Sequence, residues 1–452
     1  MINKEKILDK VIYINSVNGN FSPSEEDLIN DYYSLNFDLI KYQLENYQNS
    51  FATFCVNLSN ACNLKCDYCF NTSKDGKSMS LDTIKQYLDT CFKTFPYKDK
   101  YFVDVSGKGE PLLFLEKILQ IKDYCVEISN RINKEVLVSF VSNGTLLSTE
   151  IASILQKKGI LFGVSLDGNE IIHNKHRKTI KGEDTYKTIL DNVNAIKHHE
   201  YVGAATTLTK DVFSLVDSLK ELGEIFQTVG YKPARDCNEA FDGESIDKWL
   251  MEYDKLTLFL LDECIVNSND KYIKMLLNGD DYFGKFIKRI LTNQRVHLRC
   301  DGGLSRMSLN DDGNVYICPS SFSYDELKVG DINYINKEEQ RKIFDEQIEK
   351  EHCKGCSVKY LCGGECLIEK RLSNGNNRFM CKYKKHLILL SLYFALTLIE
   401  RNYPMFIHIS NFAKSTLVRY KKDEELEKFL KEHPEYNFVE GKEVFDNLYK
   451  KY

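Results

Sequence analysis

Cysteine spacing constrains this chain more than any other feature, because ten of its fifteen cysteines fall into two spaced sets. The first set, Cys62, Cys66 and Cys69, reads C-x-x-x-C-x-x-C and follows an apolar run at 54–58 that is typical of a buried strand. Three thiolates can hold a cluster of four irons and leave one iron open to a small molecule. Taken alone, such a triplet also fits a zinc site or three unrelated loop cysteines.

Composition limits the cellular compartment and the kinds of partner that we expect for this chain. The chain has 452 residues and is 43% hydrophobic, which predicts a large core. Its net charge of −5 predicts no nucleic-acid partner. No signal-peptide pattern opens it, so we expect a cytoplasmic location in which reduced, clustered cysteines indicate metal. The longest apolar run, 387–399, is too short to span a bilayer and predicts a buried helix and no membrane contact.

Short β-rich runs alternate with helical patterns from residue 54 to about residue 232. This alternation predicts an α/β fold with a parallel sheet, either a βα barrel or a doubly wound sheet. The expected strands are 54–58, 101–106, 135–142, 161–166, 204–208 and 227–231. Ser80 is expected to cap the helix that follows the first strand. In such folds the chemistry gathers at the carboxyl ends of the strands.

Polar motifs follow three of these strands. Residues 106–111 read Ser-Gly-Lys-Gly-Glu-Pro, residues 142–145 read Ser-Asn-Gly-Thr, and residues 165–168 read Ser-Leu-Asp-Gly, with Arg177 in the next loop. Each motif alone is an ordinary turn or cap. Together they supply an acid for an amine, hydroxyl and amide groups for a ribose, and an arginine for a carboxylate. Those are the polar groups of S-adenosylmethionine (SAM).

On these motifs, and on the cysteine loop at 62–69, the region 51–240 resembles the radical SAM enzymes. The resemblance implies a partial (β/α)6 TIM-like barrel and a [4Fe-4S] cluster on the first three cysteines. It also implies that SAM is bound by Tyr68, Gly109, Glu110, Ser142, Asn143, Ser165, Asp167, Arg177 and Leu208.

The resemblance assigns a role to several of these residues. Glu110 would bind the methionine amine, and Arg177 its carboxylate. Ser165 would bind the ribose, while Tyr68 and Leu208 would lie against the adenine. The chain departs from the family pattern at residue 108, where a lysine replaces one of two usual glycines, so the backbone geometry there is in question.

The second set comprises Cys300, Cys318, Cys353, Cys356, Cys362, Cys366 and Cys381. Its pattern resembles the SPASM auxiliary-cluster domain of peptide-modifying radical SAM enzymes, although the block at 353–366 alone would also fit a zinc ribbon. The resemblance implies two further [4Fe-4S] clusters, three in all. The outer cluster would take Cys353, Cys356, Cys362 and Cys381, and the inner one Cys300, Cys318 and Cys366.

The inner cluster lacks one cysteine. Sulfatase-maturing relatives carry an eighth cysteine six residues after the first, where this chain has Arg306. The inner cluster therefore either takes an unusual ligand or presents an open iron to the substrate.

Five cysteines remain outside the two sets. Cys55, Cys91, Cys125 and Cys264 lie in strand or helix patterns and read as small core residues. Cys237 lies in a polar loop after the sixth strand, so it is a candidate catalytic residue that donates a hydrogen atom, or a ligand of the inner cluster. A plain loop cysteine is the alternative.

The resemblance implies an oxidoreductase that removes a hydrogen atom from a ribosomally made precursor peptide. We expect an intramolecular cross-link, because auxiliary clusters suit a net oxidation, and an open iron favours a thioether from a substrate cysteine sulfur to carbon. Carbon–carbon or carbon–oxygen cross-links come next. Formylglycine formation on sulfatases is a further alternative, weakened because Pro319 follows Cys318 where that group has an aspartate. A non-catalytic metal-binding scaffold would leave the SAM-type residues unexplained.

The flanking segments are expected to be an N-terminal extension (1–50), a helical linker (241–299), the SPASM domain (300–385) and a C-terminal extension (386–452). The last should hold a helix at 387–400, a strand-like run at 405–409 and a charged helix at 424–431. The expected partners are the precursor peptide and a reductant such as flavodoxin or ferredoxin. A separate leader-binding protein is a further candidate, because only about fifty residues precede the first strand.

Overall fold

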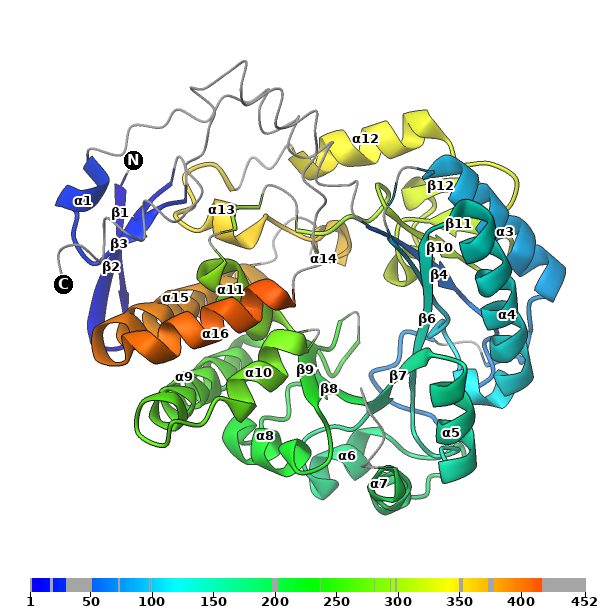
Figure 1. The fold of residues 1–452 in the computed structure, drawn as a ribbon, viewed down its shortest axis with the longest axis horizontal. Helices are drawn as coiled ribbons and strands as arrows, with labels where there is room; N and C mark the ends of the chain where they lie inside the picture. The colour runs from blue at the N-terminus through cyan, green and yellow to red at the C-terminus, as the bar shows by residue number, and fades with distance from the viewer. Residues whose placement is uncertain are drawn as a thin grey trace.

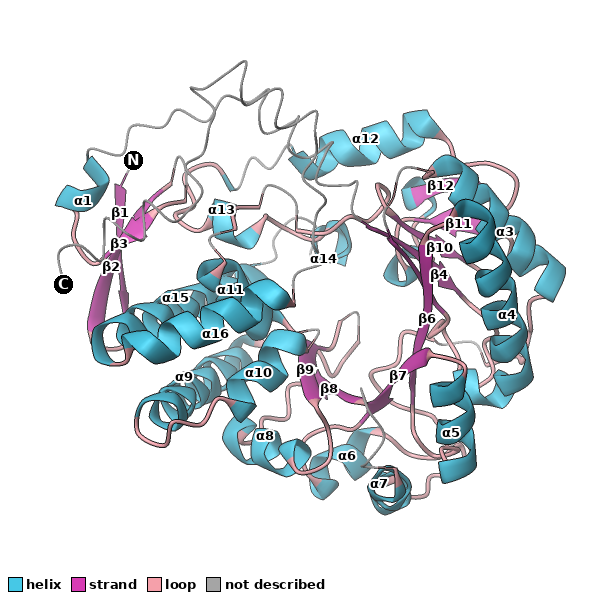
Figure 2. Cartoon of the chain, in the orientation of Figure 1, coloured by secondary structure: helices cyan, strands magenta, loops and turns pink. Residues whose placement is uncertain are grey.

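The main sheet of the molecule has nine strands. Figure 1 shows that it is curved. Its parallel part consists of six strands in chain order: β4 (Phe51–Val56), β5 (Lys100–Asp104), β6 (Glu135–Ser142), β7 (Ile160–Ser165), β8 (Gly203–Leu208) and β9 (Thr228–Pro233). The helices on its convex side are α3 (Leu81–Thr94), α4 (Leu115–Ile132), α5 (Thr149–Lys157), α6 (Glu170–His176), α7 (Tyr186–Ala195) and α8 (Leu215–Gly223) (Figure 2). The partial barrel and its six strands are thus as expected from sequence, with small shifts at the strand ends.

This computed structural model describes residues 2–16, 19–29, 51–71, 74–96, 98, 100–196, 202–235, 237–279, 281–292, 294–296, 299–348, 353–372 and 378–416. The charged helix expected at 424–431 lies outside these residues. Among the helices within them, none is long and apolar enough to cross a bilayer.

Strand β4 shows how side-chain alternation divides the two faces of the sheet. Phe54 points toward the helices, where its ring meets Phe92 of α3 edge-on at a centroid distance of 5.2 Å. Because successive side chains of a strand point to opposite faces, Thr53 and Cys55 face the concave side. Ser80 caps α3 by accepting a hydrogen bond from the amide of Thr83, which confirms the expected helix start.

The sheet continues beyond the barrel. Strand β10 (Arg306–Leu309) pairs in parallel with the free edge of β4, and β11 (Asn314–Tyr316) and β12 (Lys328–Asp331) then add antiparallel strands. The Thr90 hydroxyl of α3 donates to the carbonyl of Ile332 at 2.7 Å and ties this extension to the barrel. After α12 (Lys337–Ile348), four of the later cysteines lie on or beside α13 (Lys359–Cys362) and α14 (Leu367–Leu372). Cys300 precedes β10, Cys318 follows β11, and Cys381 lies in α15 (Arg378–Arg401).

Beside β9 lies a helical group made of α9 (Gly243–Ile265), α10 (Lys271–Asn278), α11 (Tyr282–Leu291), α15 (Arg378–Arg401) and α16 (Tyr403–Ser415) (Figure 1). The buried indole of Trp249 in α9 donates to the carbonyl of Thr209 at 2.7 Å and fastens this group to the barrel. A small antiparallel sheet of β1 (Ile2–Ile7), β2 (Lys10–Asn15) and β3 (Phe21–Ser22), followed by α1 (Glu26–Ile29), contacts α15.

Helix α15 confirms the helix expected at 387–400, but the strand expected at 405–409 is wrong, because these residues belong to α16. Phe406, Ile409 and Ala413 are buried on one face of α16, which is the spacing of a helix. The short apolar run alternates weakly and had suggested a strand. The Asn402 side chain, which accepts from the amide of Met405 at 3.2 Å, and Pro404 in the first turn favour a helix start instead.

A helix and a strand at 405–409 would bury different side chains, so they predict different losses of stability for substitutions there. Phe406 is 3% exposed, whereas Ile407 is 39% exposed. In urea unfolding, Phe406→Ala should lower the free energy of unfolding by about 3–5 kcal/mol, because it opens a cavity in the helical group. The matched control, Ile407→Ala, should cost within about 0.5 kcal/mol. Equal costs, or a larger cost at Ile407, would contradict the helical arrangement.

Candidate functional site

The loop with Cys62, Cys66 and Cys69 leaves the carboxyl end of β4 and pairs with the segment that follows α6. The amide of Lys65 donates to the Lys178 carbonyl at 2.8 Å, and Leu64 bridges Thr179. The three thiols of this loop lie close enough for their charges to interact.

Backbone amides also contact two of these sulfurs. The amides of Leu64 and Asn71 donate to the sulfurs of Cys62 and Cys69, each at 3.4 Å. Burial raises the pKa of Cys66 to about 11 in the free thiol. Amide donors stabilise a thiolate, so the loop suits sulfurs that become charged by binding iron.

Glu110 follows β5 and contacts the carboxyl end of β6. Its carboxylate accepts hydrogen bonds from the Ser142 hydroxyl at 2.8 Å, the Asn143 amide at 2.7 Å and the Leu112 amide at 3.0 Å. It is 2% exposed, and burial raises its pKa although these hydrogen bonds oppose the rise. Among the described residues no lysine or arginine forms an ion pair with Glu110, so an ammonium ligand would supply its missing countercharge.

Close backbone packing explains why Gly109 precedes Glu110. A Cβ at Gly109 would lie 2.2 Å from the Ala61 carbonyl oxygen, so the two loops meet here only with glycine. Lys108, the departure from the family pattern, has no left-handed backbone. Its ammonium instead reaches Asp311 at 3.5 Å and the ring of Phe322 at 5.0 Å.

Asn143 joins the end of β6 to the cysteine loop. Its side-chain amide donates to Asn63 at 2.8 Å, and Asn63 in turn donates to the Thr145 hydroxyl at 2.8 Å. The same nitrogen of Asn143 lies 4.0 Å from the sulfur of Cys62. The Ser-Asn-Gly-Thr motif thus contacts the first cysteine set, as its place after a strand had indicated.

Half-buried Tyr68 of this loop forms a second group with the buried residues Asp167 and Arg177. The Arg177 guanidinium donates to the Tyr68 hydroxyl at 2.5 Å, and that hydroxyl donates to the Asp167 carboxylate. The buried Nε of Arg177 has no hydrogen-bond partner among the described residues. A buried, unsatisfied guanidinium donor fits a carboxylate ligand such as that of SAM.

The last two residues expected to contact SAM lie at neighbouring strand ends. Ser165 is half-buried at the end of β7, and Leu208 is fully buried at the end of β8. Their places are compatible with a ligand lying across the strand ends, and their contacts with SAM stay predictions.

Sequence reasoning missed one part of this site, the buried His176. Its Nδ1 lies 2.9 Å from the Asp67 carboxylate and its Nε2 lies 2.9 Å from that of Asp211. The Asp67 amide also donates to the carbonyl of His176. Since Asp67 lies between two cluster cysteines and His176 precedes Arg177, this contact ties the two binding segments together. The only sequence signal was a histidine next to the expected arginine.

The charge interactions among the later cysteines follow the two expected groups, and the roles of these cysteines as cluster ligands stay predictions. The charges of Cys300 and Cys366 act on Cys318, whose pKa is raised to about 12, mainly by burial. Likewise, the charges of Cys356 and Cys362 act on Cys381. Cys353 stands one tight turn before Cys356, whose amide donates to its carbonyl at 3.1 Å.

Arg306, at the position of the eighth cysteine, is engaged elsewhere. Its guanidinium lies 3.3 Å from the Asp301 carboxylate and 3.9 Å from the sulfur of Cys55 on the concave face of β4. Burial, with the charge of Asp104, raises the pKa of Cys55 to about 11. Arg306 therefore supplies no ligand atom to the inner group.

Cys237 lies in a turn after β9 and is half-buried. Burial raises its pKa, and the acidic groups that act on it are Glu239 and Asp67 of the first cysteine loop. This location sets Cys237 beside the first loop, and its roles as a hydrogen-atom donor or an inner ligand stay predictions.

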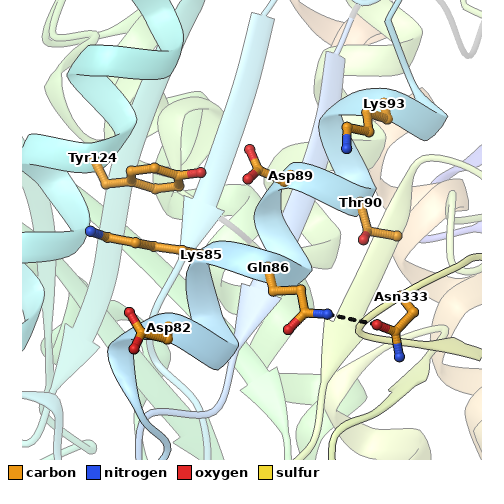
Figure 3. Close-up of a pocket in the computed structure, with 8 residues that line it drawn as sticks. All are labelled: Asp82, Lys85, Gln86, Asp89, Thr90, Lys93, Tyr124 and Asn333. Atoms are coloured by element: carbon orange, nitrogen blue, oxygen red, sulfur yellow. Dashed lines mark hydrogen bonds between the residues drawn. The ribbon is translucent and has the colours of Figure 1, made fainter.

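A separate polar groove lies on the outer face of the barrel, between α3, α4 and the turn after β12 (Figure 3). A hydrogen bond from Gln86 to Asn333 at 2.6 Å crosses it. None of the residues expected in the site lines this groove.

A partial α/β barrel with a three-cysteine loop after its first strand, a buried carboxylate after the second strand and a buried arginine after α6 has the arrangement of a radical SAM enzyme. The family model described as the radical SAM superfamily matches residues 56–212. The chain is a radical SAM enzyme, similar in sequence to anaerobic sulfatase-maturating enzymes and similar in fold to SuiB. Enzymes of this class use SAM and a [4Fe-4S] cluster, which the donor groups above fit.

Three comparisons describe its relatives. A cysteine-type anaerobic sulfatase-maturating enzyme of Clostridium novyi is 24% identical over 350 residues, which cover 71% of this chain and 89% of that protein. A solved structure of native anSMEcpe with bound AdoMet and Kp18Cys peptide is 20% identical, with a TM-score of 0.62 over 80% of this chain and 99% of its own. Streptococcus suis SuiB bound to precursor peptide SuiA is 12% identical, with a TM-score of 0.51 over 80% and 93%. These structural matches show the shared fold.

Removing either charge of the SAM site should weaken SAM binding. Glu110→Gln and Arg177→Gln each remove one charge-assisted contact, worth on the order of 1.5–3 kcal/mol, so the affinity should fall roughly tenfold or more. Isothermal titration of the reconstituted protein measures this fall. Glu116→Gln and Arg131→Gln, which change exposed residues of α4, serve as matched controls. Unchanged binding by both site variants would mean that SAM lies elsewhere.

Proposed function

We propose that this enzyme matures a ribosomally made peptide by forming an intramolecular thioether between a cysteine sulfur and a carbon. The observation that carries the proposal is the incomplete inner cysteine group. Cys300, Cys318 and Cys366 lie together, while Arg306 is paired with Asp301. One ligand position of a four-iron cluster would then stay open to a substrate thiolate.

Peptide modification is supported by the relatives. The related enzymes include sulfatase-maturating enzymes, and the matched structures were determined with a peptide or a precursor peptide bound. A radical SAM barrel joined to an auxiliary cysteine region also suits a net oxidation, because clusters can take up an electron that the substrate loses.

Each residue of the barrel site would have a defined task. Glu110 would hold the methionine amine and Arg177 its carboxylate, while the hydrogen bonds of Ser142 and Asn143 keep Glu110 in place. Tyr68, Ser165, Asp167 and Leu208 would enclose the ribose and adenine, and Gly109 would allow close approach. When bound, SAM and the cluster on Cys62, Cys66 and Cys69 supply a carbon radical that removes a hydrogen atom from the peptide.

The overall change in the peptide is balanced. One carbon–hydrogen bond breaks and its hydrogen leaves with the deoxyadenosyl group of SAM. The cysteine thiol loses its proton, the new sulfur–carbon bond forms, and one electron passes to an auxiliary cluster. Cys237 remains the candidate for returning a hydrogen atom if the reaction stops before the bond forms.

Formylglycine formation is a second candidate, favoured by the similarity to sulfatase-maturating enzymes. Against it, the turn that begins at Cys318 continues as Pro319 and Ser320 and presents no carboxylate. Carbon–carbon and carbon–oxygen cross-links stay alternatives with the same loss of hydrogen.

The reaction also needs an electron donor and a reducing compartment. We propose flavodoxin or ferredoxin as the donor and the cytosol as the location, because cluster cysteines must stay reduced. Leader recognition is proposed for a separate protein or for another surface of this chain.

The ten spaced cysteines predict three clusters. Anaerobically reconstituted protein should contain about twelve irons and about twelve sulfides per chain. The triple variant Cys62→Ala, Cys66→Ala, Cys69→Ala should lose about four irons, because it lacks the first cluster and keeps the other two. It should form no 5′-deoxyadenosine, because the first cluster is the one expected to bind SAM. Replacing the core residues Cys91 and Cys125 by alanine serves as the control and should keep all iron. Zinc in place of iron and sulfide would refute the cluster assignment.

The thioether can be tested with candidate precursor peptides, chosen from short cysteine-containing reading frames beside the gene. The product should be two hydrogen atoms lighter and have one fewer alkylatable thiol, and the peptide should change the spectrum of the inner cluster. A Cys→Ser peptide should leave that spectrum unchanged.

Three outcomes would redirect this proposal. A product two hydrogens lighter with every thiol free would replace the thioether by a carbon–carbon or carbon–oxygen cross-link. If Cys237→Ala alters the resting inner cluster before peptide is added, Cys237 fills the open position. Conversion of a sulfatase peptide to formylglycine would favour the second candidate.

A further inference from the structure

A buried group of charges surrounds Glu369 of α14. Its carboxylate lies 2.6 Å from Arg299, 2.8 Å from Lys384 and 3.7 Å from Arg235. Glu369 and Lys384 are each only 2% exposed at the side chain, whereas Arg235 keeps 30%. The four residues come from separate segments, so only the tertiary structure brings them together.

The charges in this group do not balance. Three cations share one carboxylate, which leaves two positive charges without a countercharge inside the group. Tyr282 contacts both arginines, since its ring lies 4.8 Å from the Arg299 guanidinium and its hydroxyl accepts from Arg235, but it adds no negative charge. Keeping excess charge out of water is costly, so the arrangement requires a further anion nearby.

The inner cysteine group can supply that anion. Arg299 directly precedes Cys300, and Glu369 follows Cys366 by three residues. Burial lowers the pKa of Arg235, but Glu369 and the three inner cysteines raise it above its usual value. Free thiols are neutral near pH 7, whereas cluster-bound cysteines are thiolates, so the missing charge is present when the cluster is bound.

We propose that Arg235, Arg299 and Lys384, arranged by Glu369, form the electrostatic environment that raises the reduction potential of the inner auxiliary cluster. A positive environment favours the reduced, more negative cluster, so the cluster accepts the electron lost by the substrate. Arg235, the most exposed of the three, is placed to compensate a substrate thiolate as well. Glu369 is a positioning residue, because it acts through the cations. This inference rests on the inner cluster of the proposed function.

Redox titration of the reconstituted enzyme, followed by electron paramagnetic resonance, tests the inference. Arg235→Gln and Arg299→Gln should each shift the inner cluster to a more negative potential and leave the other two unchanged. Glu369→Gln should shift it in the opposite direction, because it removes a negative charge. Arg235→Lys should restore the potential. Arg371→Gln is the matched control, since Arg371 also lies on α14 but pairs with Glu346 and Glu326.

The outcomes separate this inference from the proposed function. If Cys318→Ala removes no iron and no signal, the inner cluster does not exist and the proposed function fails. If the cluster is present and both arginine variants keep the wild-type potential, the electrostatic inference is wrong and the proposed function stands. If one arginine variant fails to assemble the cluster, the other and Glu369→Gln decide by the sign of the shift.

Discussion

Strand β4 is hydrogen-bonded on both edges, and the arrangement of the cysteine groups depends on this pairing. One edge holds β5 of the barrel, and the other holds β10 in register, with Leu309 opposite Val56. The turn after β10 therefore reaches the first cysteine loop, where Asn60 donates to Asp311 at 2.7 Å. At the far end of the same hairpin, Cys300 and Cys318 meet.

The barrel site is held together by neutral hydrogen bonds around buried charges. Glu110 joins the ends of β5 and β6 through amide and hydroxyl donors, and Arg177 joins the segment after α6 to the cysteine loop through Tyr68. Glu110 has no ion pair among the described residues, and Arg177 has one, to the Asp167 carboxylate at 3.7 Å. A ligand that carries an ammonium and a carboxylate would pair with both side chains. Burying these two charges lowers the stability of the fold but keeps the site preformed for one kind of molecule.

The region of the later cysteines has a different distribution of charge from the barrel site. There the protein concentrates cations around Glu369, next to thiols that become anionic when iron binds. The barrel site would therefore supply opposite charges to a zwitterionic ligand, whereas the auxiliary region would supply excess positive charge to an anionic cluster. This division suits a reaction in which one region starts a radical and the other takes up an electron.

The sequence by itself determined the class of fold, the place of the cysteine loop after the first strand and the polar motifs after the next three. These features depend on local spacing, such as apolar alternation in β4 and the cap at Ser80, which physical rules translate directly into structure. Only the tertiary structure decided that 405–409 is helical, because burial of Phe406 and Ile409 against the helical group outweighs a weak alternation. It also decided that His176 contacts Asp67, that Arg306 turns to Asp301 and that three cations meet at Glu369. The Arg306 pair spans only five residues, but the contacts of His176 and Glu369 join residues far apart in the chain. No local pattern specifies which distant charge a side chain will meet.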